Sequence, residues 1–206
     1  MSRWTRSVSF GGSYIFRRNP LALLTLAIGL ALVSSFVPKA PAQQGLDLGG
    51  SPADPFKESP RKLVVLVFIR TDCPISNRYA PLIEEMSAKY EAAATFWLVF
   101  PDKRETPEQI RKYEQDYAYK LPTLRDPEYA LVKKSRVKVT PEVGVFDRKG
   151  DLVYHGRIDN LYRDFGKARR EATTHELEDA IEAANKGVAP AATSASGIGC
   201  FIADLK

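Results

Sequence analysis

Two uninterrupted apolar runs mark the predicted core of the chain. Residues 63–69 (LVVLVFI) and 94–100 (ATFWLVF) carry no charge, and the first is rich in β-branched side chains. Runs of this length and composition are typical of strands that are covered on both faces of a sheet. Between the two runs, apolar side chains recur at helical spacing, at Leu82, Ile83, Met86 and Tyr90. We therefore predict a strand, a helix and a second buried strand.

A capping signal opens the next predicted helix. Thr106 is followed by a proline and, three positions on, by Gln109. In this pattern the N-cap side chain accepts a hydrogen bond from the backbone amide of N3, and the N3 side chain accepts one from the backbone amide of the N-cap. Proline suits the first helical turn. Further along, residues 122–124 predict a short extended segment and residues 128–134 a short helix.

The remaining pattern predicts a hairpin and a final helix. Residues 143–146 and 152–158 flank the turn sequence DRKG, which predicts two antiparallel strands. Residues 173–176 (TTHE) predict a second capping box, for a helix that ends at Gly187. Strands and helices thus alternate along residues 61–187, which indicates a single α/β domain.

The chain begins with the pattern of an export signal. Residues 1–42 hold five basic and no acidic side chains, and residues 21–37 (LALLTLAIGLALVSSFV) are uncharged. A basic segment, an apolar segment and the small-residue exit Ala40-Pro41-Ala42 follow the order of a secretory signal peptide. The alternative is an uncleaved membrane anchor, because a run of 17 residues is near the minimum that crosses a bilayer. In both cases we expect the rest of the chain to be exported to a periplasmic or other extracytoplasmic compartment.

The segments that flank the predicted domain differ from it in composition. Residues 43–60 are rich in Gly, Pro, Ser and Asp and have no periodicity, so we predict a flexible linker there. Residues 188–206 form a tail of mostly small residues that carries Cys200.

The net charge of the chain resides in its leader. The 206 residues include 30 Lys and Arg against 25 Asp and Glu, a formal charge of +5. Five of the basic residues and none of the acidic ones precede residue 43, so the remainder is electrically balanced. We therefore expect no nucleic-acid binding. The hydrophobic content of 44% and the charged content of 27% are ordinary for a globular domain.

The candidate chemistry of the chain centres on a cysteine. Only two cysteines occur, Cys73 and Cys200, which excludes a disulfide-dense scaffold and a four-cysteine metal site. Cys73 follows the first predicted strand and opens the predicted helix. Free backbone N–H groups and the helix dipole favour a thiolate at this position, and the thiolate is the nucleophilic form. Because an idle thiol is a liability in an oxidising compartment, we predict a reactive Cys73 rather than an inert buried one.

Two stretches resemble a known family, namely RTDCPIS after the first strand and VTPEVGVFDRKGDLVYHGRID before the last helix. Over about residues 61–186 the chain resembles the thioredoxin-like redoxins, in particular the alkyl hydroperoxide reductase and thiol-specific antioxidant branch and related exported oxidoreductases. The resemblance implies a thioredoxin-like α/β fold, with a central mixed β-sheet flanked by helices. It also implies that Cys73 is the nucleophile. Thr140-Pro141 is then a cis peptide that faces Cys73 and, with Pro74, shapes a groove where a substrate strand pairs.

The chain departs from the family at two positions. Ser76 stands where a thioredoxin carries its second cysteine, so no disulfide forms within the motif. Peroxiredoxins place Thr or Ser three residues before the cysteine, where this chain has Arg70, with Thr71 one residue later. Thr71 can still bond the sulfur or a peroxide, and Arg70 or Arg157 can stabilise the thiolate by its charge.

Three roles are open for Cys200. As a resolving thiol it forms a disulfide with Cys73 during catalysis. As a structural residue it bonds Cys73 permanently and closes a long loop. As an intermolecular thiol it pairs with another chain.

Metal and cofactor chemistry have less support in the sequence. The thioredoxin-like copper chaperones have a second cysteine where this chain has Asn77, and a downstream histidine as well. His155 falls in a predicted strand and His175 at a predicted helix start. We therefore expect neither a metal nor a cofactor.

The sequence as a whole predicts an exported thiol-dependent oxidoreductase. We expect its partners to be protein thiols and disulfides or a peroxide, with an external thiol as reductant. The alternative is a non-catalytic binding or metal-handling module in which Cys73 and Cys200 form a structural disulfide.

Overall fold

The computed structural model of the protein describes residues 44–202. The predicted leader at 1–42, with its alternative as a membrane anchor at 21–37, lies outside the described residues. Within 44–202, no helix combines the length and the apolar character needed to cross a membrane.

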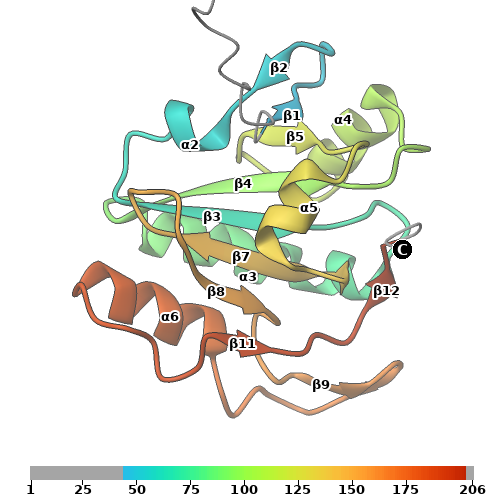
Figure 1. The fold of residues 1–206 in the computed structure, drawn as a ribbon. Helices are drawn as coiled ribbons and strands as arrows, with labels where there is room; N and C mark the ends of the chain where they lie inside the picture. Colours follow the sequence, from blue (N-terminus) through green and yellow to red (C-terminus); the bar gives the residue numbers. More distant parts are fainter. Residues whose placement is uncertain (1–43, 203–206) are drawn as a thin grey trace, which may run out of the picture. The chain divides into compact units, whose positions relative to one another are not determined.

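A mixed sheet of eight strands forms the centre of the domain, in the order β11-β8-β7-β3-β4-β5-β1-β2 (Figure 1). Its strands are β1 (Gly45–Leu46), β2 (Pro52–Ala53), β3 (Leu63–Phe68), β4 (Ala94–Phe100), β5 (Thr123–Arg125), β7 (Glu142–Phe146), β8 (Leu152–Gly156) and β11 (Ser194–Ala195). Strands β3, β4 and β5 are parallel, whereas β7 runs antiparallel to both β3 and β8. The predicted mixed sheet is therefore confirmed.

Two small ribbons lie outside this sheet. Strand β9 (Tyr162–Asp164) pairs with β10 (Lys167–Ala168), and β6 (Val139–Thr140) pairs with β12 (Cys200–Phe201). The second ribbon joins the segment before Pro141 to the C-terminal tail.

Helices cover both faces of the sheet. They are α2 (Pro55–Glu58), α3 (Pro74–Lys89), α4 (Pro107–Asp116), α5 (Ala130–Ser135) and α6 (Glu176–Asn185). Buried side chains of α3, α4 and α6 belong to one core cluster, and those of α5 to another. Figure 1 shows α3 and α5 on opposite sides of the central strands.

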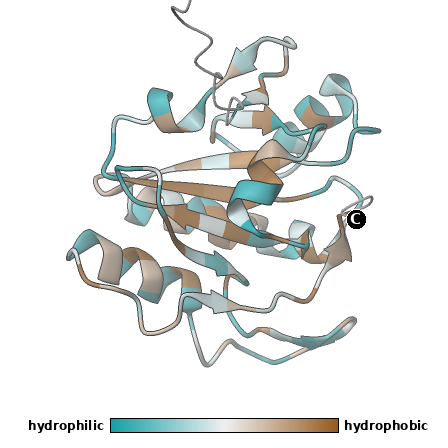
Figure 2. Cartoon of the chain, viewed as in Figure 1, coloured by the Kyte–Doolittle hydropathy of each residue, from teal (hydrophilic) through white to brown (hydrophobic). Residues whose placement is uncertain are grey.

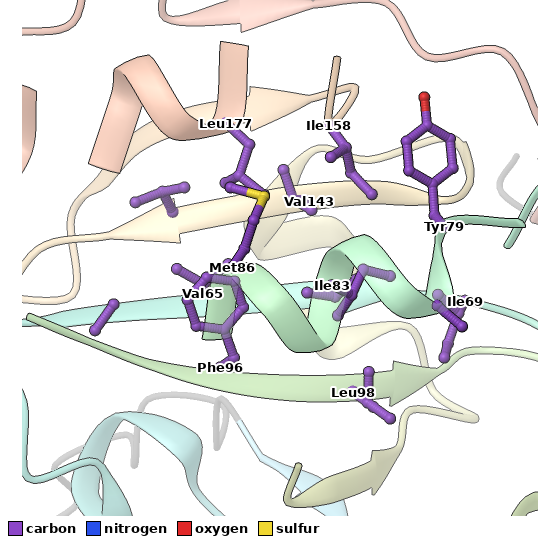
Figure 3. Close-up of a cluster of buried hydrophobic side chains, with 14 of the residues drawn as sticks. Val65, Ile69, Tyr79, Ile83, Met86, Phe96, Leu98, Val143, Ile158 and Leu177 are labelled. Carbon is purple, nitrogen blue, oxygen red and sulfur yellow. The ribbon is translucent and has the colours of Figure 1, made fainter. Parts of the chain in front are cut away.

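The apolar run of β3 is buried along its whole length because it serves both clusters. Leu63, Val65 and Val67 point into the cluster with α3 and α6, where Figure 3 shows Val65 near Met86 and Phe96. The alternate residues of β3 pack in the cluster beneath α5. Successive side chains of a strand point to opposite faces, so a two-sided core needs an unbroken hydrophobic run. Figure 2 shows the central strands as the most hydrophobic part of the ribbon.

The predicted linker is ordered, which corrects the sequence-based expectation for residues 44–60. Asp47 accepts hydrogen bonds from the amides of Gly49 and Ser51, both at 2.8 Å, and this turn joins β1 to β2. Leu46 pairs with a residue of β5, so the hairpin extends the main sheet. Asp54 then caps α2 through its side chain. Gly, Pro and Asp supply these turns and caps, the same composition that suggests disorder when tertiary partners are unknown.

One of the two predicted capping boxes is confirmed and the other is wrong. Thr106 and Gln109 form the reciprocal bonds that start α4. Helix α6 instead begins after His175, which makes no side-chain capping bond. The amide of Thr173 donates to Asn160, at 2.8 Å, so this threonine belongs to the preceding loop.

A buried carboxylate anchors the start of α5. Asp126 is 1% exposed and accepts hydrogen bonds from the amides of Ala130 and Val132, each at 2.8 Å. Burial penalises the charged form and raises the pKa of this carboxyl to about 6, although the backbone donors offset part of the effect.

This pKa predicts a pH-dependent loss of stability. An unfolded aspartate has a pKa near 3.9, so the folded state holds the proton more tightly. The stabilising contribution is complete below about pH 4 and is lost as the pH rises through about 6; it is worth about 3 kcal/mol. In denaturant titrations, the free energy of unfolding of the wild type should exceed that of Asp126→Asn, and this difference should shrink as the pH rises from about 4 to about 6. A difference independent of pH would contradict this assignment.

Candidate active site

Cys73 occupies the N-cap position of α3. Its backbone is extended, with φ −93° and ψ 110°, and its side chain makes no capping bond to the helix. Pro74 is the first residue of the helix and is exposed, while Cys73 itself is 0% exposed. The sulfur therefore lies at the positive end of a 16-residue helix, where partial charges favour a thiolate.

The Thr140-Pro141 peptide is cis and lies against Cys73. The thiol of Cys73 donates a hydrogen bond to the carbonyl oxygen of Thr140, at 3.1 Å. Both Thr140 and Pro141 are buried. Cys73 follows β3, whereas Thr140 and Pro141 directly precede β7. The fold thus brings together residues that are far apart in the chain.

The C-terminal tail brings Cys200 to the same place. Strand β12 pairs antiparallel with β6, so that Cys200 lies opposite Thr140 and Phe201 opposite Val139. Both cysteines are free thiols in the structure, Cys73 buried and Cys200 partly exposed. The two thiols are close enough for each to shift the pKa of the other.

The pKa values of the two thiols move in opposite directions. Burial raises the pKa of Cys73, but hydrogen bonds from Cys200 and Ser76 lower it by more, and the net pKa lies below its ordinary value. Burial, followed by the hydrogen bond to Cys73 and the charge of that sulfur, raises the pKa of Cys200 to about 12. The pair therefore ionises at Cys73, with Cys200 as the proton donor to its sulfur.

Ser76 is the second polar residue that lowers the pKa of Cys73. It lies on the first turn of α3 and is 0% exposed, and both its hydroxyl and its amide contribute to the lower pKa. The residue that replaces the second thioredoxin cysteine is thus a source of thiolate stabilisation, a role that the sequence analysis did not assign to it.

Removing the Ser76 hydroxyl is expected to raise the pKa of Cys73. In Ser76→Ala, alkylation of Cys73 by iodoacetamide should reach its half-maximal rate at a higher pH than in wild type, because the thiolate loses a hydrogen bond. A matched control is Ser135→Ala, since Ser135 is equally buried but lies on α5. Identical pH profiles for Ser76→Ala and wild type would exclude this role.

Two residues expected near the sulfur have other partners in the structure. The amide of Thr71 donates to Glu105, at 2.6 Å. Arg157 donates from Nε to Glu176 of α6, at 3.0 Å, in an ion pair. Arg70 does approach the site: it forms ion pairs with Asp72 and Asp102, and its Nη1 donates to the carbonyl of Phe201, at 3.3 Å.

Two buried acids near the site were not singled out from the sequence. Glu105 is 7% exposed, and burial raises its pKa even though Thr71 donates to it. Glu142 accepts the amide of Lys138, at 2.7 Å, and the amide of Gly197, at 2.9 Å, so it ties the segment before Pro141 to the tail. In the sequence, only the position of Glu142 directly after Pro141 points to a role near the site. Its partner Gly197 lies 55 residues further along the chain, so the contact itself could not be predicted.

Metal-binding geometry is not found in the part of the chain that the structure describes. Between residues 44 and 202, no three His, Cys, Asp or Glu side chains are grouped closely enough to hold a metal ion.

A strand-to-helix cysteine that faces a cis-proline, in a mixed sheet of this order, defines the thioredoxin-like class of protein. Comparison with known proteins agrees: a family model described as thioredoxin-like matches residues 61–152. The described part of the chain thus has a thioredoxin-like fold. A search of curated protein sequences found no significant match.

Several solved structures are similar to this chain. A hypothetical protein from Sinorhizobium meliloti is 26% identical, with a TM-score of 0.64 over 77% of this chain and 88% of that one. An uncharacterized conserved protein from Geobacillus kaustophilus is 19% identical, with a TM-score of 0.64 over 77% and 86%. A secreted disulfide oxidoreductase from Mycobacterium tuberculosis is 22% identical, with a TM-score of 0.45 over 55% and 84%.

Proposed function

We propose that this protein is an exported thiol-disulfide oxidoreductase in which Cys73 is the nucleophile and Cys200 the resolving thiol. The observation that carries the proposal is the pair of neighbouring free thiols, one at the start of α3 and one on the strand paired with β6. Export is supported by the basic and apolar pattern of residues 1–42.

In the first step, the Cys73 thiolate attacks one sulfur of a substrate disulfide. A bond forms between Cys73 and that sulfur, the substrate S–S bond breaks, and the other substrate sulfur leaves as a thiolate that takes up a proton. The lowered pKa of Cys73 keeps this nucleophile ionised at a lower pH than an ordinary cysteine.

In the second step, Cys200 loses its proton and attacks the Cys73 sulfur of the mixed disulfide. The bond between Cys73 and the substrate breaks, the remaining substrate sulfur leaves as a thiolate that takes up a proton, and a Cys73–Cys200 disulfide remains. The charge of Cys73 and the hydrogen bond to it help to hold the pKa of Cys200 at about 12. Both vanish once Cys73 is in a mixed disulfide, so Cys200 becomes easier to ionise when it is needed. Overall, two electrons and two protons pass from the protein to the substrate.

An external thiol reductant then restores both thiols. Attack is expected at Cys200, because its sulfur lies on a partly exposed residue and Cys73 is fully buried. Cys73 is also the better leaving group, since its pKa is the lower of the two. Phe165 and Phe201, 60% and 79% exposed, line a cavity of about 620 Å³ beside Cys200, which offers the reductant an apolar approach.

Disulfide rather than peroxide chemistry is favoured by the position of Thr71. Its amide donates to Glu105, and its side chain also interacts with Glu105 rather than with the Cys73 sulfur. The cis peptide beside Cys73 instead suits an extended polypeptide, because it presents a strand edge next to the sulfur.

Trapping a mixed disulfide tests the proposal. When Cys200→Ser is mixed with a nitrobenzoate disulfide, one equivalent of thiolate should be released and a mixed disulfide should accumulate at Cys73, seen by intact mass. Wild type should release the second equivalent and end as an internal disulfide. Equal steady turnover by both proteins would refute resolution by Cys200, and the absence of an adduct at Cys73 would refute the nucleophile.

A further inference from the structure

The C-terminal tail follows a defined path across the domain. Beyond α6, β11 pairs parallel with β8 at the edge of the sheet. The amide of Gly197 then donates to Glu142, β12 pairs with β6, and the amide of Ile202 donates to the carbonyl of Lys138, at 3.0 Å. Figure 1 shows this last part of the described chain running from α6 past β11 to β12. Hydrogen bonds therefore hold the tail at several points between residues 193 and 202.

Two glycines allow the tail to approach this closely. A Cβ atom at Gly199 would lie 2.1 Å from the carbonyl oxygen of Thr140, and one at Gly197 would lie 2.7 Å from Cγ of Glu142. Real Cβ atoms do not reach such distances, so any larger residue at position 199 must push the strand away from β6. The glycine before Cys200 is thus a condition for docking.

The residue that follows β12 supplies the hydrophobic anchor. Ile202 is 5% exposed and belongs to the core cluster that includes Val132 and Val137 of the α5 region. Phe201, between Cys200 and Ile202, is exposed, as the alternation of a strand requires. The docked segment therefore has the pattern of a glycine at 199, a cysteine at 200, an exposed residue at 201 and a buried aliphatic residue at 202.

With the tail docked, the strand edge of β6 is occupied and Cys73 is 0% exposed. A substrate strand cannot pair with Val139 and Thr140 at the same time as β12. Substrate entry thus requires the tail to leave, and the return of the tail for resolution expels the substrate strand.

We infer that β12 is a built-in competitor of the substrate, and that the site on β6 takes an extended polypeptide with glycine directly before its cysteine and an aliphatic residue two positions after it. The inference rests on the proposed function for the identity of the substrate as a disulfide-bearing polypeptide. It adds the sequence preference of the groove and the exchange of strands that gives access to Cys73.

The exposure of Cys73 tests the competition in the full chain. In a Cys200→Ser background, Cys73 is the remaining cysteine, and its alkylation rate is measured at a pH high enough to ionise it fully. Adding Gly199→Ala should raise this limiting rate roughly tenfold or more, because the strand is displaced. Ser196→Ala, an exposed tail position, serves as the matched control and should leave the rate unchanged. Equal rates in all three proteins would overturn the inference.

A peptide added in trans tests the preference and shows that the variant is folded. The hexapeptide Gly-Ile-Gly-Ser-Phe-Ile, at millimolar concentration, should protect Cys73 of the Gly199→Ala protein in a saturable manner. Gly-Ile-Ala-Ser-Phe-Ile should not protect it. Protection by both peptides or by neither would overturn the preference. Because alkylation needs no turnover, these results are independent of the mixed-disulfide experiment that tests the proposed function.

Discussion

Replacing Cys73 by serine is expected to lower the rate of disulfide reduction by roughly a thousandfold or more, to the background of the reductant alone. A serine hydroxyl is not ionised near neutral pH and forms no bond of disulfide type, so the donors around position 73 have no thiolate to stabilise. The measurement is steady-state reduction of a polypeptide disulfide with a dithiol reductant in excess.

The fold itself should survive this substitution. Serine is close to cysteine in volume and can donate to the Thr140 carbonyl as the thiol does, at the position where the thiol bond spans 3.1 Å. Cys200→Ser is the matched control: it should retain the first step, with adduct at Cys73, and lose the second. If Cys73→Ser retained a turnover rate within tenfold of wild type, another residue would have to be the nucleophile.

Oxidation of the cysteine pair is expected to stabilise the native state by as much as about 5 kcal/mol. The Cys73–Cys200 bond encloses about 127 residues, and the entropy model of loop closure assigns a value of this size to so long a loop. The pairing of β12 with β6 already holds the two cysteines close together before oxidation, which favours formation of the bond. Denaturant titrations of the oxidised and the reduced protein measure the difference.

The control for this measurement is Cys200→Ser, whose stability should not respond to oxidant or reductant. A gain below about 1 kcal/mol in wild type would contradict an intramolecular bond between docked thiols. By thermodynamic linkage, the same free energy opposes reduction of the disulfide, while the lowered pKa of Cys73 favours the reduced state. The balance between the two sets the direction in which the protein drives exchange.

The central strands were predictable because a run of consecutive apolar residues indicates burial on both faces of a sheet. An unbroken run such as that of β3 has few other stable placements than the middle of a two-sided core. The start of α4 was equally readable, since Thr106 and Gln109 complete each other's bonds within one turn. The start of α6 was not, because Thr173 bonds Asn160, thirteen positions earlier, and that contact replaces the local cap.

The order of residues 44–60 illustrates the limit of composition. Glycine, proline and aspartate serve equally in a mobile linker and in a tight hairpin, and the choice depends on whether β5 offers a free edge to β1. Nothing in the local sequence of the segment indicates whether that edge of β5 is free.

The sequence by itself determined the place of Cys73 between a strand and a helix, because that place depends on adjacent residues, and its resemblance to the redoxins indicated the class of the fold and the cis-proline. Only the tertiary structure decided the partners of Cys73. Ser76 is local, three positions after Cys73, but Cys200, Glu142 and the amide of Gly197 reach the site through contacts across long separations. Hydrogen bonds between distant backbone segments depend on the fold of the whole domain, so a tail of mostly small residues forms the strand that pairs beside Cys73.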